Sequence, residues 1–287
     1  MSENEIDKET GVETTGHEWD GIRELNNPLP RWWLWTFYAT IVWGIGYTVA
    51  YPAWPMISGA TSGVMGFSTR GEVAADIAVH EARNADLVAA LNGADLTAIA
   101  PPDDLHRYAV ARGGAVFRAQ CSQCHGQGAA GAKGFPNLLD NDWLWGGDQE
   151  AIAYTIRHGV RNDTDGEARY SQMPAFGDIL PPEEIDAVVE HVISLSADTY
   201  DAALAEAGAQ VFADNCAMCH GDDATGNRDL GAPNLADAIW LYGGDRATLT
   251  ETVKNARFGV MPAWGQRLSE EDVRAVAVYV HSLGGGE

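Results

Sequence analysis

All four cysteines of this 287-residue chain lie in two copies of one short motif. Residues 121–125 read Cys-Ser-Gln-Cys-His, and residues 216–220 read Cys-Ala-Met-Cys-His. A zinc ribbon has its two cysteine pairs about 15 to 20 residues apart, and a thioredoxin motif needs no histidine after its second cysteine. Cys-x-x-Cys-His is instead the attachment pattern of c-type haem, so the chain is predicted to fold around covalently bound porphyrins.

Each motif supplies two kinds of contact to a haem, so two haem c groups are predicted. The two thiols add to the vinyl groups of the porphyrin, and the adjacent histidine is held beneath the iron as its proximal ligand. Because covalent haem attachment is completed outside the cytoplasm, this part of the chain is expected to be periplasmic. The candidate attachment residues are Cys121, Cys124, Cys216 and Cys219, and the candidate proximal ligands are His125 and His220.

The two motifs lie within a longer internal repeat. Trp-Leu-Trp-Gly-Gly-Asp at 143–148 matches Trp-Leu-Tyr-Gly-Gly-Asp at 240–245. Arg157-His-Gly-Val is then aligned with Arg257-Phe-Gly-Val. The second copy continues directly into Met261-Pro-Ala, whereas the first copy inserts RNDTDGEARYSQ before Met173-Pro-Ala.

The equivalence of Met173 and Met261 within the repeat makes them the candidate sixth ligands of the two irons. His/Met ligation gives an iron with a raised potential and no open position, which suits electron transfer rather than oxygen binding. Met173 lies 48 residues after His125, and Met261 lies 41 residues after His220, so each methionine is expected to serve the haem of its own copy. His158 is the alternative sixth ligand in the first copy.

Four further residues are expected around the haems. Pro136 and Pro233 stand where a backbone carbonyl can accept the second ring N–H of a proximal histidine. Arg157 and Arg257 are aligned in the repeat, and a guanidinium group at this position can pair with a haem propionate.

Residues from Trp32 to Thr69 include no Asp, Glu, Lys or Arg. At a rise of 1.5 Å per residue, the first twenty of them would span about 30 Å, the thickness of a bilayer core. Tryptophan and tyrosine gather at both ends of this stretch, as expected at membrane interfaces. A transmembrane helix is therefore predicted over 32–52, and the acidic leader favours an uncleaved anchor over a signal peptide.

The predicted anchor divides the rest of the chain. Residues 1–31 are expected to be cytoplasmic, with 1–20 mobile because they are charged and lack apolar periodicity. Residues 53–102 are expected to form a segment at the membrane surface, a helix over 72–91 and a linker. Lys and Arg number 18 against 41 Asp and Glu, and the resulting net charge of −23 disfavours nucleic acid as a partner. That charge favours either a basic protein partner or solubility alone.

Each repeat resembles a class I cytochrome c domain in its Gly-x-x-x-Phe helix, its Cys-x-x-Cys-His motif and its Met-Pro loop. The chain as a whole resembles the dihaem subunit III of cbb3-type cytochrome c oxidases. The most specific part is Asp20-Gly-Ile-Arg-Glu24 followed by Asn26-Asn-Pro-Leu-Pro30 ahead of aromatic residues. The resemblance implies an all-α fold in which one transmembrane helix precedes two tandem cytochrome c domains, at 103–198 and 199–287.

The same resemblance implies a function. Such a subunit receives electrons from a soluble or membrane-anchored cytochrome c. It passes them through a monohaem cytochrome c subunit to the catalytic subunit, where haem and copper reduce oxygen in aerobic or microaerobic respiration. It is itself a non-catalytic part of a proton-pumping oxidase in the bacterial inner membrane. Some relatives carry two membrane spans, whereas one is expected here.

Two other classes of protein share parts of this pattern. Dihaem cytochrome c peroxidases also carry two such motifs, but one of their irons must open a position for peroxide, whereas this repeat supplies a Met-Pro to both. A free-standing membrane-anchored electron shuttle or a haem-based gas sensor would need no oxidase. Purification in mild detergent separates the shuttle from the oxidase subunit, because only the subunit would bring a partner with b-type haem.

Overall fold

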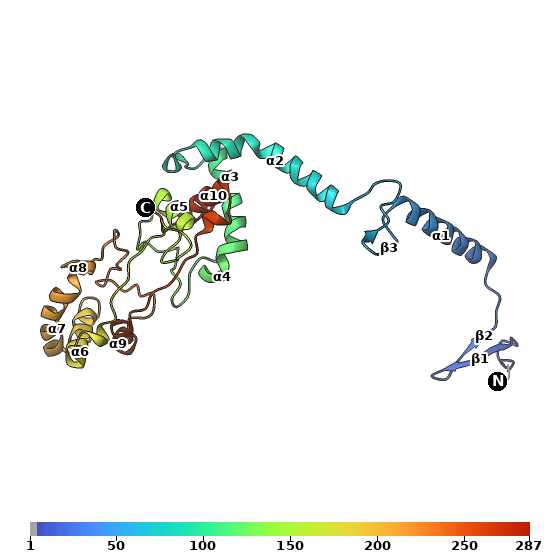
Figure 1. Ribbon diagram of the computed structural model, residues 1–287. Helices are drawn as coiled ribbons and strands as arrows, with labels where there is room; N and C mark the ends of the chain where they lie inside the picture. Colours follow the sequence, from blue (N-terminus) through green and yellow to red (C-terminus); the bar gives the residue numbers. More distant parts are fainter. Residues whose placement is uncertain (1–4) are drawn as a thin grey trace. The chain divides into compact units, whose positions relative to one another are not determined.

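The structure, a computed structural model, describes residues 5–287 and divides into two units that meet in the sequence between Arg83 and Asn84. Residues 1–4 of the predicted cytoplasmic segment lie outside the described residues. The first unit contains a β-hairpin, a long helix, a short pair of strands and the first part of a second long helix, and the second unit contains most of the helices (Figure 1).

A hairpin over residues 14–25 includes part of the segment 1–20, which was expected to be mobile. β1 (Thr14–Trp19) pairs antiparallel with β2 (Ile22–Leu25). Asp20 and Gly21 both have positive φ, the backbone that a tight Asp-Gly hairpin turn requires. Arg23 also bonds Glu18 at 2.9 Å and Glu5 at 2.6 Å. Charge and missing apolar periodicity suggested mobility, but turn chemistry and paired charges decide this segment.

The helix expected over 32–52 is confirmed as a helix, α1 (Arg31–Ala50), but its expected character as a membrane span is not. Within residues 5–287, no helix combines the length and the apolar character that crossing a membrane requires. Threonine, tyrosine, tryptophan and glycine alternate with the aliphatic side chains of α1 and lower its mean hydropathy. None of its residues is buried.

After α1 come a short pair of strands and a long helix. β3 (Pro55–Met56) pairs with β4 (Gly59–Ala60), and α2 (Thr69–Gly93) contains the helix expected over 72–91. The stretch after it was expected to be a linker, yet Leu96 and Ile99 are almost completely buried there, as is Leu91 near the end of α2. The segment that includes the short helix η1 (Leu96–Ala98) is therefore part of a core.

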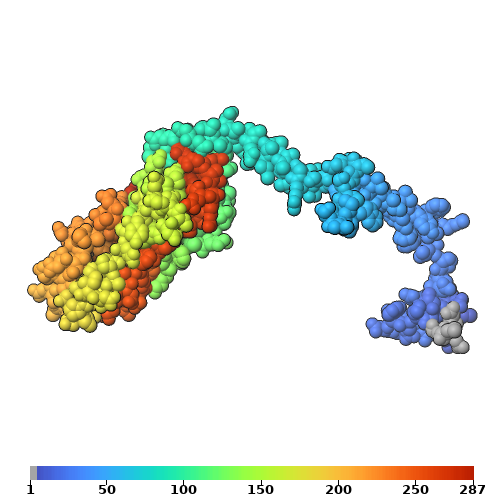
Figure 2. Space-filling model, viewed as in Figure 1, coloured from blue at the N-terminus to red at the C-terminus, as the bar shows by residue number. Residues whose placement is uncertain are grey.

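One helical core, called the first core below, combines the two ends of the second unit. α3 (Asp104–Val116) packs against α10 (Glu270–His281), and α5 (Gln149–His158) packs against the same helix. In Figure 2 the red C-terminal residues accordingly lie beside green residues from early in the unit. A Cβ on Gly113 would lie 2.1 Å from the carbonyl oxygen of Ala275, so only glycine permits this close crossing of helices.

A second core is built from the middle of the sequence. α6 (Pro182–Ser194) packs against α7 (Ala202–Asn215), and α9 (Arg246–Asn255) packs against α6. Gly208 repeats the close crossing, because a Cβ there would lie 2.0 Å from the carbonyl oxygen of Ala187. Each predicted Gly-x-x-x-Phe helix therefore crosses a closing helix, but the closing helix comes from the other copy of the repeat.

This exchange corrects the division into tandem domains at 103–198 and 199–287. The chain leaves the first core after α5 and returns to it only after α9. At the crossing point Val160 and Met261 exchange two backbone hydrogen bonds, of 3.0 and 2.9 Å. The second core is thus inserted between the two parts of the first, and local sequence patterns that are alike in both copies are compatible with either pairing.

The close helix crossing predicts a large effect of one methyl group. Gly113→Ala should destabilise the second unit by about 1–3 kcal/mol, because its Cβ would overlap a backbone oxygen that cannot rotate away. Chemical denaturation followed by circular dichroism measures this change. Gly93→Ala is the matched control, since nothing lies within 4 Å of a Cβ at that helical position. Equal stability of the two variants would contradict the packing of α3 on α10.

Candidate haem centres

The first Cys-x-x-Cys-His motif forms a helical turn at the end of α3. A π-helical turn, η2 (Phe117–Cys121), leads into the short helix α4 (Ser122–His125). Residues three apart lie on one side of a helical turn, so both thiols are presented together. Cys121 and Cys124 are free thiols, and Cys124 is exposed. Two adjacent free thiols beside a histidine are the groups that covalent haem attachment requires.

The second motif repeats this arrangement after α7. Cys216 lies at the junction with the short helix α8 (Ala217–His220), and Cys219 lies within it. Both are free thiols. Burial is the main cause that raises the pKa of Cys216 and of Cys121 to about 11, and the other cysteine of each motif adds to this increase. These thiols are therefore protonated at neutral pH, and among residues 5–287 no cluster of three metal-type side chains surrounds them.

The histidines of both motifs are held in the same way. His125 donates its Nδ1 hydrogen to the carbonyl oxygen of Pro136, and His220 donates to that of Pro233, each at 3.0 Å. These are the two carbonyls that the sequence predicted. The bond fixes the ring and leaves Nε2 with its lone pair for a metal. Burial lowers the pKa of both histidines, although the carbonyl bond opposes it, so both favour the neutral, ligating form.

A tight loop after each motif brings the proline carbonyl back to the histidine. The N–H of Gly131 donates to the carbonyl of His125 at 2.9 Å, and that of Gly226 donates to His220 at 2.8 Å. Both glycines have positive φ, and a Cβ on Gly131 would lie 2.4 Å from a backbone oxygen. The loop thus depends on glycine both for its φ and for the close return of the chain.

Met261 belongs to the core that contains His125. It packs against the first core together with Cys121, and its backbone is paired with Val160. The side-chain amide of Asn162 also donates to the carbonyl of Met261 at 3.2 Å. Met261 was expected to bind the haem of the second motif, whereas the packing places it in the core that contains the first motif.

Met173 enters the opposite core. It precedes the short helix η3 (Phe176–Asp178), which packs on α9 and α6. Phe176 is buried there, and a Cβ on Gly177 would lie 2.9 Å from the carbonyl oxygen of Lys254. Each core therefore contains one Cys-x-x-Cys-His motif and the Met-Pro loop of the other copy. The physical reason is the exchange of closing helices, since each Met-Pro loop leads directly into the closing helix that follows it.

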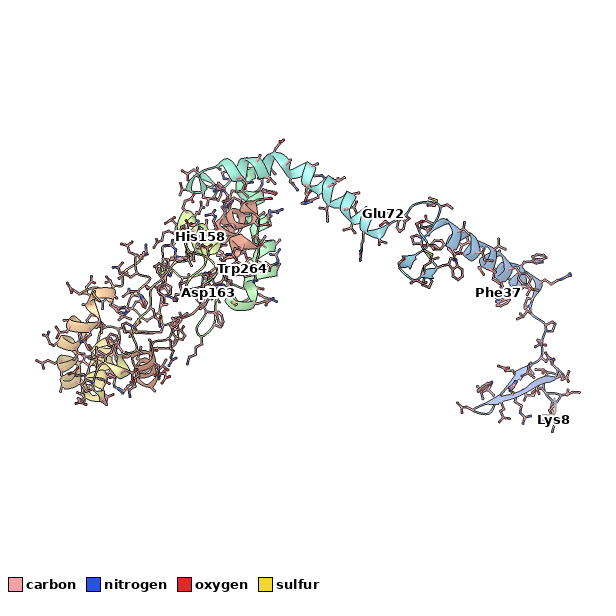
Figure 3. All side chains as sticks on the ribbon, in the orientation of Figure 1. Lys8, Phe37, Glu72, His158, Asp163 and Trp264 are labelled. Atoms are coloured by element: carbon pink, nitrogen blue, oxygen red, sulfur yellow. The ribbon has the colours of Figure 1, made fainter. Side chains whose placement is uncertain are left out.

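His158, the alternative sixth ligand, has other partners, and so does His281 on the closing helix of the second copy. The ring of His158, labelled in Figure 3, bonds Asp165 at 3.0 Å, lies 3.4 Å from Glu167 and contacts the ring of Tyr154 in a tilted arrangement. His281 bonds the carbonyl of Glu287 at 2.9 Å. His158 is thus engaged within the inserted segment of the first copy, which does not support it as the alternative ligand.

The two arginines expected at haem propionates behave differently from each other. Arg157 forms a bidentate bond with Glu270, at 2.5 and 3.2 Å. Its guanidinium group is therefore neutralised by the protein, contrary to the expectation. Arg257 instead lies 5.5 Å from the ring centroid of Tyr242 and donates to the carbonyl of Thr248 at 3.3 Å.

A buried donor that sequence reasoning missed lies in the Trp-Leu-Trp turn that precedes α5. The indole Nε1 of Trp145 is buried and has no hydrogen-bond partner among residues 5–287. A buried N–H without an acceptor costs free energy, so such a group points to a partner from outside the chain. Haem propionates are acceptors of the required kind, and together with the thiols and the oriented histidines this donor fits a haem c group.

Comparison with known proteins agrees with these features. The family model described as "Cytochrome C oxidase, cbb3-type, subunit III" matches residues 108–192 and 203–280, and the model "N-terminal domain of cytochrome oxidase-cbb3, FixP" matches residues 11–58. The chain is similar to the cbb3-type cytochrome c oxidase subunit CcoP of Cereibacter sphaeroides, with 63% identity over 96% of this chain and 95% of the relative. It is also similar to the subunit FixP of Sinorhizobium medicae, with 55% identity over 98% of both chains.

The exchanged methionines can be tested by spectroscopy. In a chain whose first motif is removed by Cys121→Ala and Cys124→Ala, one haem remains, and Met173→Ala should abolish its near-infrared sulfur-to-iron band. Met261→Ala should leave that band unchanged. The reciprocal background, Cys216→Ala with Cys219→Ala, should give the opposite result. Loss of the band in the first background on changing Met261 would contradict the exchange.

The partly buried carboxyl group of Asp142 predicts a pH dependence of stability. Burial is the main cause that raises the pKa of Asp142 to about 6. The negative charges of Asp237 and Asp140 add to the increase, and the positive charge of Arg228 opposes it. The folded chain therefore binds this proton more tightly than the unfolded chain, whose aspartates titrate near pH 4, and stability falls as the pH rises from about 4 to 6.

Asp142→Asn should remove that penalty. Above pH 6 the variant should be more stable than the parent by about 1–2 kcal/mol, because the side chain is still partly solvated, and at pH 4 the two should be equal. Thermal unfolding across this pH range measures the difference. Asp163→Asn, at an exposed position, is the control. A stability gap that does not change with pH would contradict the prediction.

Proposed function

The chain belongs to the family of subunit III of cbb3-type cytochrome c oxidases, and from this premise we propose that it is the electron-receiving dihaem subunit of such an oxidase. The observation that supports this most directly is the matched pair of histidines. In both cores the Nδ1 of the motif histidine is bound to a proline carbonyl at 3.0 Å, and the same core contains a Met-Pro loop. Two similar sites of this kind suit a carrier of single electrons.

The proposed ligation follows the packing and not the repeat. Cys121 and Cys124 would hold one haem c by covalent attachment, and His125 and Met261 would bind its iron. Cys216 and Cys219 would hold the other, whose iron would be bound by His220 and Met173. When bound, each haem supplies one-electron redox chemistry without an open coordination position. The protein orients the histidine rings, keeps them neutral and surrounds each site with apolar side chains.

The partners of the subunit follow from its family and its charge. We propose that it accepts electrons from a cytochrome c, soluble or membrane-anchored, and delivers them through a monohaem cytochrome c subunit to the haem-copper subunit that reduces oxygen. The net charge of −23 favours a basic donor, since opposite charges steer association. The chain itself is proposed to have no catalytic site. A dihaem peroxidase is less well supported, because both cores receive a methionine.

Attachment to the membrane is proposed through α1. This helix includes one charged residue, Arg31 at its start, and its tryptophan and tyrosine side chains are exposed. Side chains of this kind partition into membrane interfaces. We propose a single-pass anchor in the bacterial inner membrane, with the N-terminus cytoplasmic and both haem centres periplasmic. This proposal rests on the missing charges and exposed aromatic side chains rather than on mean hydropathy.

One experiment tests the proposal as a whole. The tagged chain should be recovered from the membrane fraction in mild detergent together with a polytopic partner that contains b-type haem, and the preparation should consume oxygen in a cyanide-sensitive reaction. A variant that lacks residues 31–50 is the control and should lose the membrane association. A chain that carries c-type haem but purifies alone from gently solubilised membranes would instead indicate an independent electron shuttle.

A further inference from the structure

The hairpin of β1 and β2 (Figure 1) carries two large apolar side chains on one exposed face. Trp19 and Ile22 are directly opposite each other in the strand register, so both side chains lie on the same side of the hairpin. Their side chains are 66% and 73% exposed. On the other side, Glu18 is opposite Arg23 and forms an ion pair with it, and Arg23 also bonds Glu5. One side of the hairpin is thus held by charge pairs, whereas the other leaves apolar surface uncovered by the described residues.

A hairpin of this kind gains stability from a partner that covers it. Two strands alone are marginally stable in water, and further strands or a packed layer are needed for independent stability. Thr14, a polar residue, is the only buried residue among residues 5–25, so this segment has no apolar core of its own. Trp19 and Ile22 are therefore the side chains whose burial by another molecule would stabilise the hairpin, and tryptophan is among the residues that contribute most to protein interfaces.

The rim of this apolar face is acidic. Asp20 lies in the turn beside Trp19, and Glu24 lies two residues after Ile22, on the same side of its strand. Residues 5–25 contain seven Asp and Glu against two Lys and Arg, a net charge of −5. The face therefore fits a partner whose contact surface is surrounded by positive charge.

The short connection to α1 restricts where that partner can lie. Residues 26–30 join the hairpin to α1 and include Pro28 and Pro30. Even at full extension, the chain from Leu25 to Arg31 reaches only about 20 Å. Because α1 is the proposed anchor and the N-terminus is proposed to be cytoplasmic, the hairpin stays close to the cytoplasmic face of the membrane.

Charge distinguishes the two kinds of surface that are available there. The cytoplasmic leaflet is negatively charged and attracts basic segments, so it repels a segment with a charge of −5. The cytoplasmic loops of polytopic membrane proteins are, by contrast, enriched in Lys and Arg. We propose that the face formed by Trp19 and Ile22 docks on the basic cytoplasmic loops of the polytopic haem-copper subunit. Asp20 and Glu24 then pair with lysine and arginine side chains of those loops. This inference rests on the proposed function, which supplies both the topology and the partner.

The contact can be tested in the full chain within its native membrane by placing a photoreactive benzophenone side chain at position 22. After irradiation, the product should join this chain to the haem-copper subunit, and mass spectrometry should place the link in a cytoplasmic loop rich in Lys and Arg. Trp19→Ala should lower the yield of this product by roughly fivefold or more, because truncation of a tryptophan anchor weakens an interface strongly. Trp19→Phe should restore part of the yield, since it keeps an aromatic ring.

Two glutamates provide a matched pair of charge variants. Glu24→Gln should lower the yield by about twofold to fivefold, because it removes one charge at the rim of the docked face. This difference should shrink at high salt concentration, which screens exposed charges. Glu9→Gln removes the same charge from the turn over residues 7–12 and should leave the yield unchanged.

The outcomes separate this inference from the proposed function. A chain that purifies from gently solubilised membranes without a haem-copper subunit would overturn both. An intact complex in which position 22 links to phospholipid, or to no protein, would overturn the docking alone. Should Trp19→Ala fail to accumulate, a yield that is the same in Glu24→Gln as in Glu9→Gln would overturn it equally.

Discussion

Two backbone hydrogen bonds, between Val160 and Met261, mark the constraint on which the second unit depends. At this point the chain passes from one core to the other in both directions. The helices between the two residues, α6, α7 and α9, pack together in the second core, whereas α3, α5 and α10 lie outside them and form the first. The helix pairs α3 with α10 and α6 with α7 are the consequence, and the glycines at their crossings permit backbone contact that no other residue would allow.

The exchange links the two candidate haem centres through covalent structure. In a tandem arrangement, each centre would be complete within its own domain, and a change in one domain would leave the other intact. Here the closing helix and Met-Pro loop of each core are supplied by the other copy of the repeat, so neither centre is complete without both copies. The pairs formed by Arg169 with Trp145 and by Arg257 with Tyr242 lie at the start of the two crossing segments.

Much of the site could be predicted from local chemistry. The spacing of Cys121, Cys124 and His125 predicts covalent attachment and a proximal ligand, and this stays a prediction. The position of Pro136 correctly indicated its carbonyl as the partner of the histidine ring. Such features depend on a few neighbouring residues. The pairing of helices could not be predicted, because a glycine at position 113 or 208 is compatible with either closing helix. The residue of the first copy that is equivalent to Arg257 was misassigned as Arg157 for a related reason. The insertion allows two alignments of the first copy, and it is Arg169 that lies over the aromatic ring of its turn as Arg257 does.

The exchange also changes the meaning of the short connection between α6 and α7. In a tandem arrangement this connection would join two domains and could be either a hinge or a strut. In the observed packing both helices belong to the second core, and Glu190 accepts a hydrogen bond from the N–H of Asp201 at 2.9 Å, so the connection is an internal turn.

The two cores contact each other through the loop that follows each Cys-x-x-Cys-His motif and the Trp-Leu-aromatic turn of the other core. The N–H of Gly134 donates to the carbonyl of Leu241 at 2.9 Å, and Gly231 packs against the ring of Trp145 so closely that a Cβ would overlap it. The distance between two irons bound here would be set by this packed surface, and a fixed distance is what stepwise electron transfer between two carriers in one chain requires.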